Sequence, residues 1–279
     1  MERSTIGEID KITVKNNKAS FSFTPMGATV LSYIPKNGQE LFWLGNYNSF
    51  KNGVAIRGGI PICFPRFGLE ELNSHFDKHG FARNETWVID NIEESDDLTV
   101  IALSLNQSAK YSYAVTLRLK ITLSDYLEME LEALNIGDAN VSFSEALHTY
   151  FTVGNINDIT IEGLAGANYY DEMDDFKVKK HTDDKLVVNQ FIDRIFFNNE
   201  NPVKIVDSNL KRVIHIEKKG ALSTIVWNPY QRALGDEVNE TDYQNFVCVE
   251  AGNVNNNAVT LKPGEKHKLV MRVWAAPLQ

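Results

Sequence analysis

Apolar and polar residues alternate along most of this 279-residue chain. The clearest case is the segment from Val115 to Leu123, in which every second residue is aliphatic. A period of two is typical of a β-strand with one buried and one solvated face. The pattern recurs between short polar turns, so we expect strands over residues 9–14, 19–23, 28–34, 41–44, 86–92, 98–105, 112–123, 126–135, 141–153, 159–161, 186–188, 194–197, 203–206, 212–216, 222–227, 246–250 and 268–274.

Helical periodicity is missing from the sequence. No window of about a dozen residues carries the 3.6-residue apolar repeat of an amphipathic helix. The charged stretch over residues 171–180 is expected to form a solvated turn or a short helix. The sequence therefore predicts an all-β fold, a large twisted antiparallel β-sandwich. In the absence of linkers or repeats, we expect a single domain over residues 1–279.

One long stretch, residues 45–84, interrupts the alternation and is rich in Gly, Pro and Asn. A connection of this length inside a compact domain is usually functional or disordered. Apolar residues along the stretch, among them Ile56, Ile60 and Phe64, indicate that it is ordered.

Two arginines in this connection are candidate ligands for an anion. Arg57 precedes a glycine pair, Gly58 and Gly59, which lets backbone pass close to a bound group. Arg83 follows His79 in the segment HGFAR. Two guanidinium groups on one stiffened loop would clamp a phosphate or carboxylate. The alternative is a surface loop whose arginines pair with some of the chain's many acids.

His148 lies inside an alternating segment, residues 142–151. An imidazole fixed on one face of a sheet is a candidate general acid or base, because its ordinary pKa lies near neutrality. The alternative is a half-buried histidine bonded to a neighbouring strand. Alternation divides the segment into a mixed face with Ser144, Ala146, His148 and Tyr150 and an apolar, core-like face with Phe143, Leu147 and Phe151.

Glu250 closes the apolar segment FVCVE, in which it shares a face with Phe246 and Cys248. A carboxylate in such surroundings must be paired, exposed at the strand end, or used in chemistry. If Glu250 and His148 face one cleft, they form an acid–base pair in two different environments.

Other polar residues give weaker indications. His75 and His79 have i, i+4 spacing but no clear third ligand, so no metal site is expected. Asp193 opens a strand and would bind a hydroxyl group or form a surface ion pair. Trp227 ends a strand, and its ring suits either the C–H side of a sugar or a core edge. The remaining histidines in charged surroundings, which we expect to be solvated, are His181, His215 and His267.

Composition and charge argue against several classes of protein for this chain. With 43% hydrophobic residues the chain can bury a large core and is not disordered. The net charge of −9, with no basic run, argues against a nucleic-acid partner, and an anionic ligand would need a local positive site. No apolar run approaches the roughly 20 residues of a membrane helix, and no signal peptide is visible.

The two cysteines, Cys63 and Cys248, exclude a disulfide framework. We expect both to be reduced, small, buried apolar residues. These features favour a soluble cytoplasmic protein without a membrane partner, and a monomer is our default expectation.

Six short motifs follow one another along nearly the whole chain, and their order carries information beyond any single motif. They are RGGIPICFP from Arg57, HGFARN from His79, EALHTYF from Glu145, DRI from Asp193, WNP from Trp227 and CVEAG from Cys248. This set resembles the glucose-6-phosphate 1-epimerases, the hexose-6-phosphate mutarotases of the aldose 1-epimerase superfamily. The resemblance implies the large β-sandwich of galactose mutarotase, in agreement with the strands expected above.

Carried over position by position, the resemblance implies that His148 and Glu250 are the catalytic pair. Lys78 falls where related sequences often have another polar residue such as Gln. We expect Lys78 to contact the substrate as well. Arg66 departs from the aromatic or aliphatic residue of many relatives, so it would contact a phosphate or point to solvent. The substrate-binding residues implied by the resemblance are Arg57, Lys78, His79, Arg83, Asp193 and Trp227.

The chemistry of anomer exchange fits these residue types. Opening a hemiacetal requires a base that takes the C1 hydroxyl proton and an acid that protonates the ring oxygen. We expect Glu250 to be the base and His148 the acid, with exchanged roles when the ring closes on its other face. The reaction needs no metal or redox cofactor. A phosphate with about −1.5 to −2 charges would account for two arginines in an acidic protein.

Two other functions are compatible with the sequence. One is an aldose 1-epimerase that acts on unphosphorylated hexoses, and the other is a non-catalytic carbohydrate-binding protein on the same sandwich. A glycosidase would need two carboxylates that flank the scissile bond, whereas only Glu250 stands out.

Overall fold

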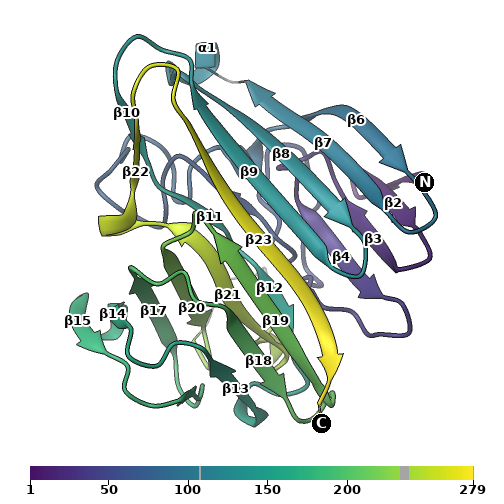
Figure 1. Cartoon of the computed structure of the whole chain (residues 1–279), viewed down its shortest axis with the longest axis vertical. Coiled ribbons are helices and arrows are strands. Elements are labelled where there is room, and N and C mark those ends of the chain that lie inside the picture. The colour runs from purple at the N-terminus through teal and green to yellow at the C-terminus, as the bar shows by residue number, and fades with distance from the viewer. Residues whose placement is uncertain (107, 233–238, 279) are drawn as a thin grey trace.

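Two large antiparallel sheets dominate the computed structural model, which describes residues 1–106, 108–232 and 239–278 (Figure 1). The larger sheet has nine strands in the order β16-β13-β18-β19-β23-β9-β8-β7-β6. Its strands are β6 (Val88–Glu94), β7 (Thr99–Asn106), β8 (Val115–Leu123), β9 (Leu127–Asn135), β13 (Ile159–Glu162), β16 (Lys185–Leu186), β18 (Val203–Asp207), β19 (Arg212–Lys219) and β23 (Lys266–Pro277).

The second sheet has eight strands in the order β15-β14-β17-β20-β21-β11-β5, and β12 also pairs with β21. Its strands are β5 (Ile62–Cys63), β11 (Glu145–Leu147), β12 (Tyr150–Thr152), β14 (Asn168–Asp171), β15 (Lys177–Lys180), β17 (Ile192–Phe197), β20 (Ser223–Asn228) and β21 (Phe246–Asn253).

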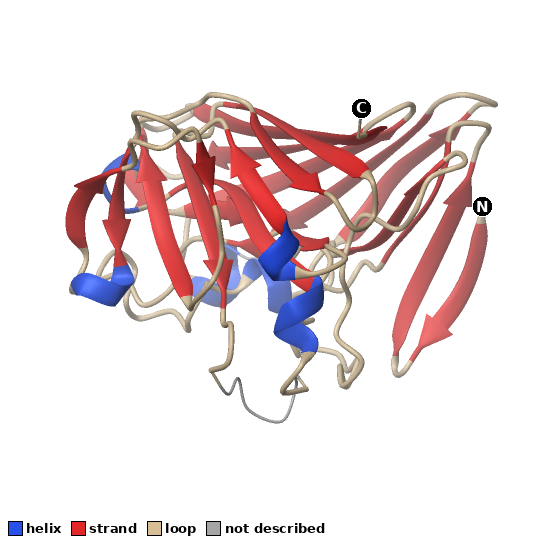
Figure 2. Cartoon of the chain, turned by 90° about the horizontal axis from the view of Figure 1, so that it is seen from below, coloured by secondary structure: helices blue, strands red, loops and turns tan. Residues whose placement is uncertain are grey.

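Two smaller sheets and a few helical turns complete the described part of the chain. The strands of the smaller sheets are β1 (Glu2–Ile6), β2 (Ile9–Lys15), β3 (Ala19–Phe23) and β4 (Val30–Pro35), with β10 (Val141–Phe143) paired to β22 (Val259–Leu261). The helical turns are α1 (Ser108–Tyr111), η1 (Ala82–Asn84), η2 (Ile156–Asp158), η3 (Glu172–Asp174), η4 (Asp242–Asn245) and η5 (Asn255–Asn257). Figure 2 shows most of these turns below the strands in that view.

Among the described residues, no helix has the length and apolar character needed to cross a membrane.

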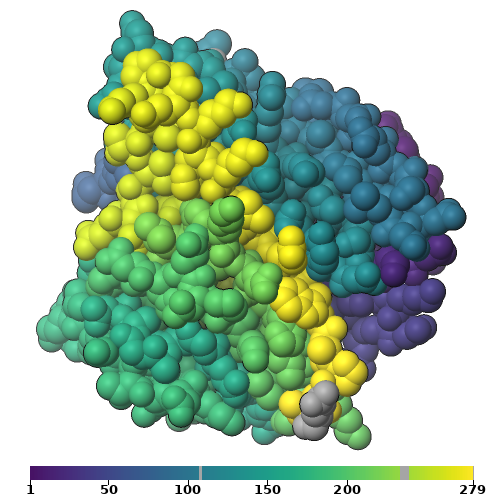
Figure 3. All heavy atoms as spheres, viewed as in Figure 1, coloured from purple at the N-terminus to yellow at the C-terminus, as the bar shows by residue number. Residues whose placement is uncertain are grey.

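One continuous apolar core joins the sheets. In β8 the residues Leu117, Leu119 and Ile121 are buried, and the polar residues between Leu117 and Ile121 are exposed. The same core contains Phe21 of the four-stranded sheet and Val249 of the eight-stranded sheet. In the space-filling view of Figure 3, β23 crosses the middle of the face formed by the nine-stranded sheet. The expected all-β sandwich with alternating burial is confirmed.

The structure departs from the expected strands in several places. Residues 41–44 make only isolated bridges, from Phe42 to Phe151 and from Leu44 to Gly58. The expected strand over residues 141–153 is divided into β10, β11 and β12. Between β11 and β12 the backbone N–H of Thr149 turns to the carbonyl of Leu147, 2.8 Å away. The charged stretch 171–180 contains the expected short helix, η3, but also strand β15. Strands β1, β5, β14 and β22 were not expected.

The long connection 45–84 is ordered by apolar packing, as expected, with Ile56, Ile60 and Phe64 buried. Its glycine pair has positive φ angles of 119° and 63°. A Cβ on Gly59 would lie 1.9 Å from the carbonyl oxygen of Val30. The close approach that these glycines permit is therefore to the protein's own backbone, not to a ligand.

Arg66 organises the same connection from within. Its side chain is buried, with the Nε donating to the carbonyl of Glu70 at 2.8 Å and Nη1 to the carbonyl of Phe76 at 2.7 Å. Both alternatives that the sequence left for Arg66, a phosphate contact and a solvent-facing side chain, are wrong. The guanidinium instead satisfies loop carbonyls that would otherwise be buried without donors.

Two of the histidines that we expected to be solvated are not. His181 is buried, and its ring contacts Phe196. The side chain of His267 is 23% exposed, and its Nε2 lies 3.0 Å from Oε1 of Glu145, which is fully buried. Asn253 donates to the same oxygen at 2.9 Å. This cluster joins β11 and β21 of one sheet to β23 of the other.

The buried Glu145 should contribute several times as much to the free energy of unfolding as a surface ion pair does. Replacing Glu145 with alanine removes the carboxylate that His267 and Asn253 share and leaves them only the carbonyl of Gly220. We expect a loss of about 3 kcal/mol in the free energy of unfolding. The exposed pair Glu132–Lys266 gives a matched control, Glu132→Ala, with an expected loss of at most about 1 kcal/mol. Urea unfolding measures both.

The loss should also depend on pH. Burial acts to lower the pKa of His267, but the hydrogen bond and charge of Glu145 outweigh it and raise this pKa above its ordinary value. The stabilisation is therefore complete below about pH 6.5 and is lost as pH rises through the raised pKa. The difference between wild type and Glu145→Ala should shrink from pH 6 towards pH 9, and a constant difference would contradict this assignment.

Candidate active site

The candidate site lies on one face of the eight-stranded sheet, along two neighbouring rows of cross-strand residues. The first row follows the strand register from Tyr150 to Cys248, then to Trp227 and Asp193. The second row lies two residues further along the strands and includes Glu250. Side chains two residues apart in a strand point to the same face, so both rows share one side of the sheet.

The opposite face of the same strands belongs to the main core. In β21 the core-facing residues are Val247, Val249 and Ala251. Phe246 and Cys248 instead belong to a separate aromatic cluster with Trp43 and Tyr150. The division of this strand that the sequence predicts is confirmed, and Glu250 falls on the side of the aromatic cluster.

His148 and Glu250 meet on this face. Strands β11 and β12 keep one register along β21, which places His148 opposite Glu250. Nδ1 of His148 lies 3.4 Å from Oε1 of Glu250. Nevertheless, neither Nδ1 nor the second carboxylate oxygen, Oε2, has a hydrogen-bond partner among the residues that the structure describes. Since buried polar atoms are normally hydrogen-bonded, this pair has unused capacity for a ligand.

Burial sets the protonation of the pair. It lowers the pKa of His148 well below the ordinary value, and the charges of Arg83 and Arg57 lower it further. Burial also raises the pKa of Glu250 well above the ordinary value, with a further rise from Asp193 and an opposing effect of Arg83. Both shifts favour the neutral forms, an uncharged imidazole and a protonated carboxyl group.

Aromatic rings hold the imidazole of His148 in place. The Tyr150 ring stacks on it with a centroid distance of 4.8 Å and an interplanar angle of 5°. Trp227 and His79 meet it edge-on, at 6.3 and 5.3 Å. The orientation of His148 is therefore fixed by packing, without a hydrogen bond to Glu250.

His79 is held in one tautomer. Its Nδ1 accepts from the backbone N–H of Gly68 at 3.2 Å and lies 3.3 Å from Sγ of Cys63. Because Nδ1 acts as an acceptor, the ring proton sits on Nε2. Burial and the neighbouring His148 lower the pKa of His79 well below the ordinary value, so this ring is neutral. Cys63, buried as expected, therefore contacts a site residue.

The two arginines approach the pair from the long connection. The backbone N–H of Arg57 donates to the side chain of Asn48 at 2.7 Å, and its guanidinium hydrogen-bonds the Tyr150 hydroxyl. Nη2 of Arg83 donates to the carbonyl of Lys78 at 2.9 Å, whereas its buried Nε has no partner in the described part of the chain. Both positive charges act on His148.

Lys78 is exposed at the edge of the same region. Its charge lowers the pKa of both His79 and His148 and opposes the rise in the pKa of Asp193. The structure thus brings together all eight residues that the sequence singled out for the site.

Glu172 is a site neighbour that the sequence did not indicate. Strand β14 pairs Asp171 with Arg194 of β17, so the next residue, Glu172, comes beside Asp193. Burial raises the pKa of Asp193 to about 9, together with a hydrogen bond that the protonated Asp193 donates to Glu172 and the charge of Glu172. Asp193 therefore keeps its proton near neutral pH. Glu172 belongs to a run of acids that reads as a solvated turn, and only the strand register reveals its position.

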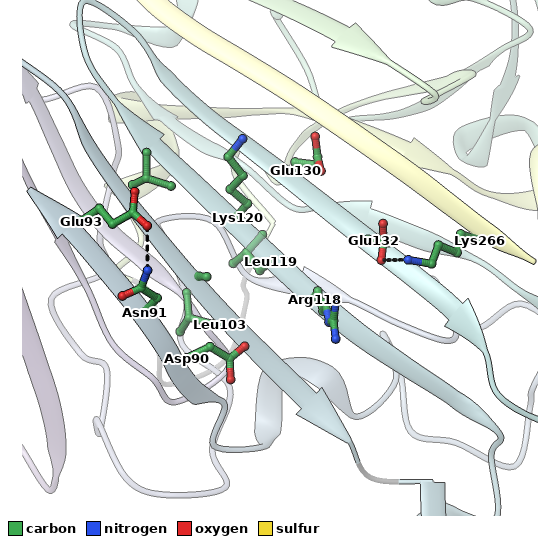
Figure 4. Close-up of a pocket in the computed structure, with 12 residues that line it drawn as sticks. Asp90, Asn91, Glu93, Leu103, Arg118, Leu119, Lys120, Glu130, Glu132 and Lys266 are labelled. Atoms are coloured by element: carbon green, nitrogen blue, oxygen red, sulfur yellow. Dashed lines mark hydrogen bonds and ion pairs between the residues drawn. The ribbon is translucent and has the colours of Figure 1, made fainter.

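A groove lies away from the catalytic candidates. It has a volume of about 310 Å³ and crosses strands β6 to β9 of the nine-stranded sheet (Figure 4). Charges of both signs line it, and Lys266 pairs with Glu132 at 3.0 Å. None of its charged side chains is buried, so the groove has no chemistry comparable to that of the buried pair.

Sequence comparisons identify relatives of this chain. Residues 10–274 match the family model "Aldose 1-epimerase". An Escherichia coli K12 protein named "Putative glucose-6-phosphate 1-epimerase" is 32% identical over 274 residues, which cover 96% of this chain and 91% of that protein. A Salmonella typhimurium protein of the same name is 34% identical and covers 90% of this chain and 85% of its own length.

Structure comparisons agree. A crystal structure described as "a putative mutarotase" from Salmonella typhimurium has a TM-score of 0.89 and 30% identity, over 99% of this chain and 93% of that one. A galactose mutarotase-like protein from Clostridium acetobutylicum has a TM-score of 0.77 over 99% of this chain and 98% of its own. At 16% identity the second likeness concerns the fold alone.

The hydrogen bond between Asp193 and Glu172 can be tested directly. In Glu172→Gln the pKa of Asp193 should fall from about 9, because one carboxylate charge is removed, but it should stay above 3.8 because burial remains. Carboxyl carbon NMR of aspartate-labelled protein measures it. Asp174→Asn is the matched control, since Asp174 lies on the same turn but pairs with Lys177. An equal fall in both variants would contradict the pairing.

Proposed function

The chain belongs to the aldose 1-epimerase family and is an isomerase, and from this premise we propose that it interconverts the α and β anomers of glucose 6-phosphate. The observation that carries the proposal is the buried pair of His148 and Glu250. Its facing atoms lie 3.4 Å apart without a hydrogen bond, under the charges of two arginines.

Ring opening requires an acid and a base that hold one transferable proton between them. The base removes the proton of the C1 hydroxyl while the acid protonates the ring oxygen, and the C1–O5 bond breaks to leave an aldehyde and a C5 hydroxyl. After rotation about C1–C2, the two side chains exchange roles and the ring closes on the other face of C1. In ring opening and again in ring closure, one proton enters the sugar and one leaves it. The pair therefore returns to its starting protonation state.

The phosphate is proposed from the local charge. The protein carries a net charge of −9, yet Arg57, Arg83 and Lys78 all act on the catalytic pair. Arginine binds phosphate oxygens bidentately, and Arg83 has a buried Nε without a partner in the described residues. A free hexose carries no negative charge for these cations to bind, which favours the phosphate ester over an unphosphorylated sugar.

Phosphate binding would also prepare the pair for catalysis. Without an anion, the pair's proton sits on Glu250, which suits an acid and not the base that we assign. A bound phosphate neutralises Arg57 and Arg83, both of which hold the pKa of His148 down. The pKa of His148 then rises, the imidazole takes the proton, and Glu250 is left as the base. In this way the substrate's own charge sets the active protonation state.

The remaining residues would position the sugar. His79 offers an Nε2–H donor because its Nδ1 accepts from Gly68. Asp193, which is hydrogen-bonded to Glu172, would bind a hydroxyl group of the sugar. Trp227 presents its indole to the C–H side of a pyranose.

The direct test is anomer exchange of glucose 6-phosphate, followed by NMR saturation transfer with glucose and galactose in parallel. We expect acceleration of the phosphate ester, and a kcat about 10²- to 10⁴-fold lower in His148→Ala and in Glu250→Ala, because each loses a general acid–base group. His215→Ala is the matched control, since His215 stacks on Trp274 in the other sheet.

Other outcomes would replace the proposal. Acceleration of the free sugars alone would make the protein an aldose 1-epimerase for unphosphorylated hexoses. No acceleration by folded protein would favour a carbohydrate-binding protein. An unchanged kcat in either catalytic variant would overturn the roles of His148 and Glu250.

The effect of phosphate on His148 has its own measurement. Imidazole NMR titrations with and without inorganic phosphate should show a higher pKa of His148 when phosphate is bound, because the ion neutralises Arg57 and Arg83. Arg57→Ala and Arg83→Ala should raise the same pKa in the absence of phosphate. A pKa of His148 that phosphate leaves unchanged, at concentrations where binding is saturated, would sink this part of the proposal.

A further inference from the structure

We propose that His148, Cys248 and Glu250 form a binding site for Zn²⁺, at which the cation competes with the sugar. The site would be inhibitory and would not hold a cofactor, since the proposed reaction uses none. The inference stands on the geometry of three buried side chains, and it does not depend on which sugar the protein converts.

The three candidate ligand atoms are already close together. The ring nitrogen of His148, the sulfur of Cys248 and a carboxylate oxygen of Glu250 all lie within 4.8 Å of one another. Nδ1 of His148 and Oε1 of Glu250 are 3.4 Å apart. Tetrahedral zinc with bonds of roughly 2.0–2.2 Å to nitrogen and oxygen has ligands separated by about 3.4 Å. This pair needs no movement to bind zinc, and Cys248 needs only a small one.

The sheet holds these atoms in place. Cys248 and Glu250 are two residues apart in β21 and therefore share a face. His148 stands opposite Glu250 in the strand register and is stacked on Tyr150. All three side chains are at least nine-tenths buried, so little conformational entropy remains to be lost on binding.

Two of the ligands have atoms that nothing in the described protein satisfies. Nδ1 of His148 and Oε2 of Glu250 are buried and lack hydrogen-bond partners there. A cation bound between the imidazole and this carboxylate would give Nδ1 a partner and place a positive charge beside Oε2. The donor set of imidazole, thiolate and carboxylate suits zinc, whereas Mg²⁺ and Ca²⁺ prefer oxygen ligands alone. Three protein ligands would leave a fourth position for water, as in open zinc sites.

The surrounding charges set the conditions for binding. Arg57, Arg83 and Lys78 oppose a cation, but thiolate and carboxylate would bring the zinc complex to zero net charge. Zinc binds thiolate and carboxylate and must displace any protons on these ligands, so binding should strengthen as pH rises. Bound zinc would occupy the lone pairs that move protons, and it would therefore block anomer exchange.

The test uses Co²⁺ as a spectroscopic substitute for zinc, added to the reduced full-length protein. We expect a thiolate-to-cobalt charge-transfer band in the near ultraviolet that equimolar Zn²⁺ displaces. Cys248→Ser should lose the band and bind Zn²⁺ at least about 100-fold more weakly, since even outer-shell partners of a metal are worth about 10- to 100-fold. Cys63→Ser, which alters the other thiol of the chain, should keep the band.

Several results would overturn the proposal. They are the absence of a band in the folded wild-type protein, a band that survives in Cys248→Ser, and a band lost only in Cys63→Ser, which would move the thiolate to the neighbourhood of His79. Circular dichroism of each variant separates loss of a ligand from loss of the fold. Cobalt binding is measured without any sugar, so a negative result here and a failure of the proposed reaction are distinguishable.

Discussion

The register between β21 and the segment that contains β11 and β12 is the constraint on which the site depends. It sets His148 opposite Glu250 on the face that turns away from the main core. Hydrogen bonds of the sheet impose this opposition, whereas the two side chains make no hydrogen bond with each other. The fold therefore supplies the alignment that a flexible acid–base pair would have to acquire at the cost of entropy.

Desolvation and local positive charge act in the same direction on His148 and in opposite directions on Glu250. Burial favours a neutral imidazole and a protonated carboxyl group, and Arg57 and Arg83 add to the first effect. An anionic ligand reverses the contribution of the arginines. The lone pairs of His148 and Glu250 can transfer protons to a sugar or coordinate a thiophilic cation. They cannot do both at once.

The long connection 45–84 supplies His79 and the positive charges beside the pair. Buried Arg66 binds its carbonyl groups, and Glu70 fastens it to Ser144 at 2.5 Å and to the backbone N–H of Asn255 at 2.8 Å. A loop tied at this many points can present Arg57 and Arg83 at fixed positions. Its irregular backbone is thus compatible with a preorganised site.

The sequence by itself determined which residues face the core, because burial on one side of a strand imposes a period of two. Alternation therefore predicted most strands, the β-sandwich and the two faces around His148 and Glu250, and the ordered motifs indicated the family. Only the tertiary structure decided which strands are neighbours, because a period of two says nothing about the partner. The place of Glu172 beside Asp193 depends on strand pairing, and the buried role of Arg66 depends on how the long connection folds back on itself, so a period of two could reveal neither.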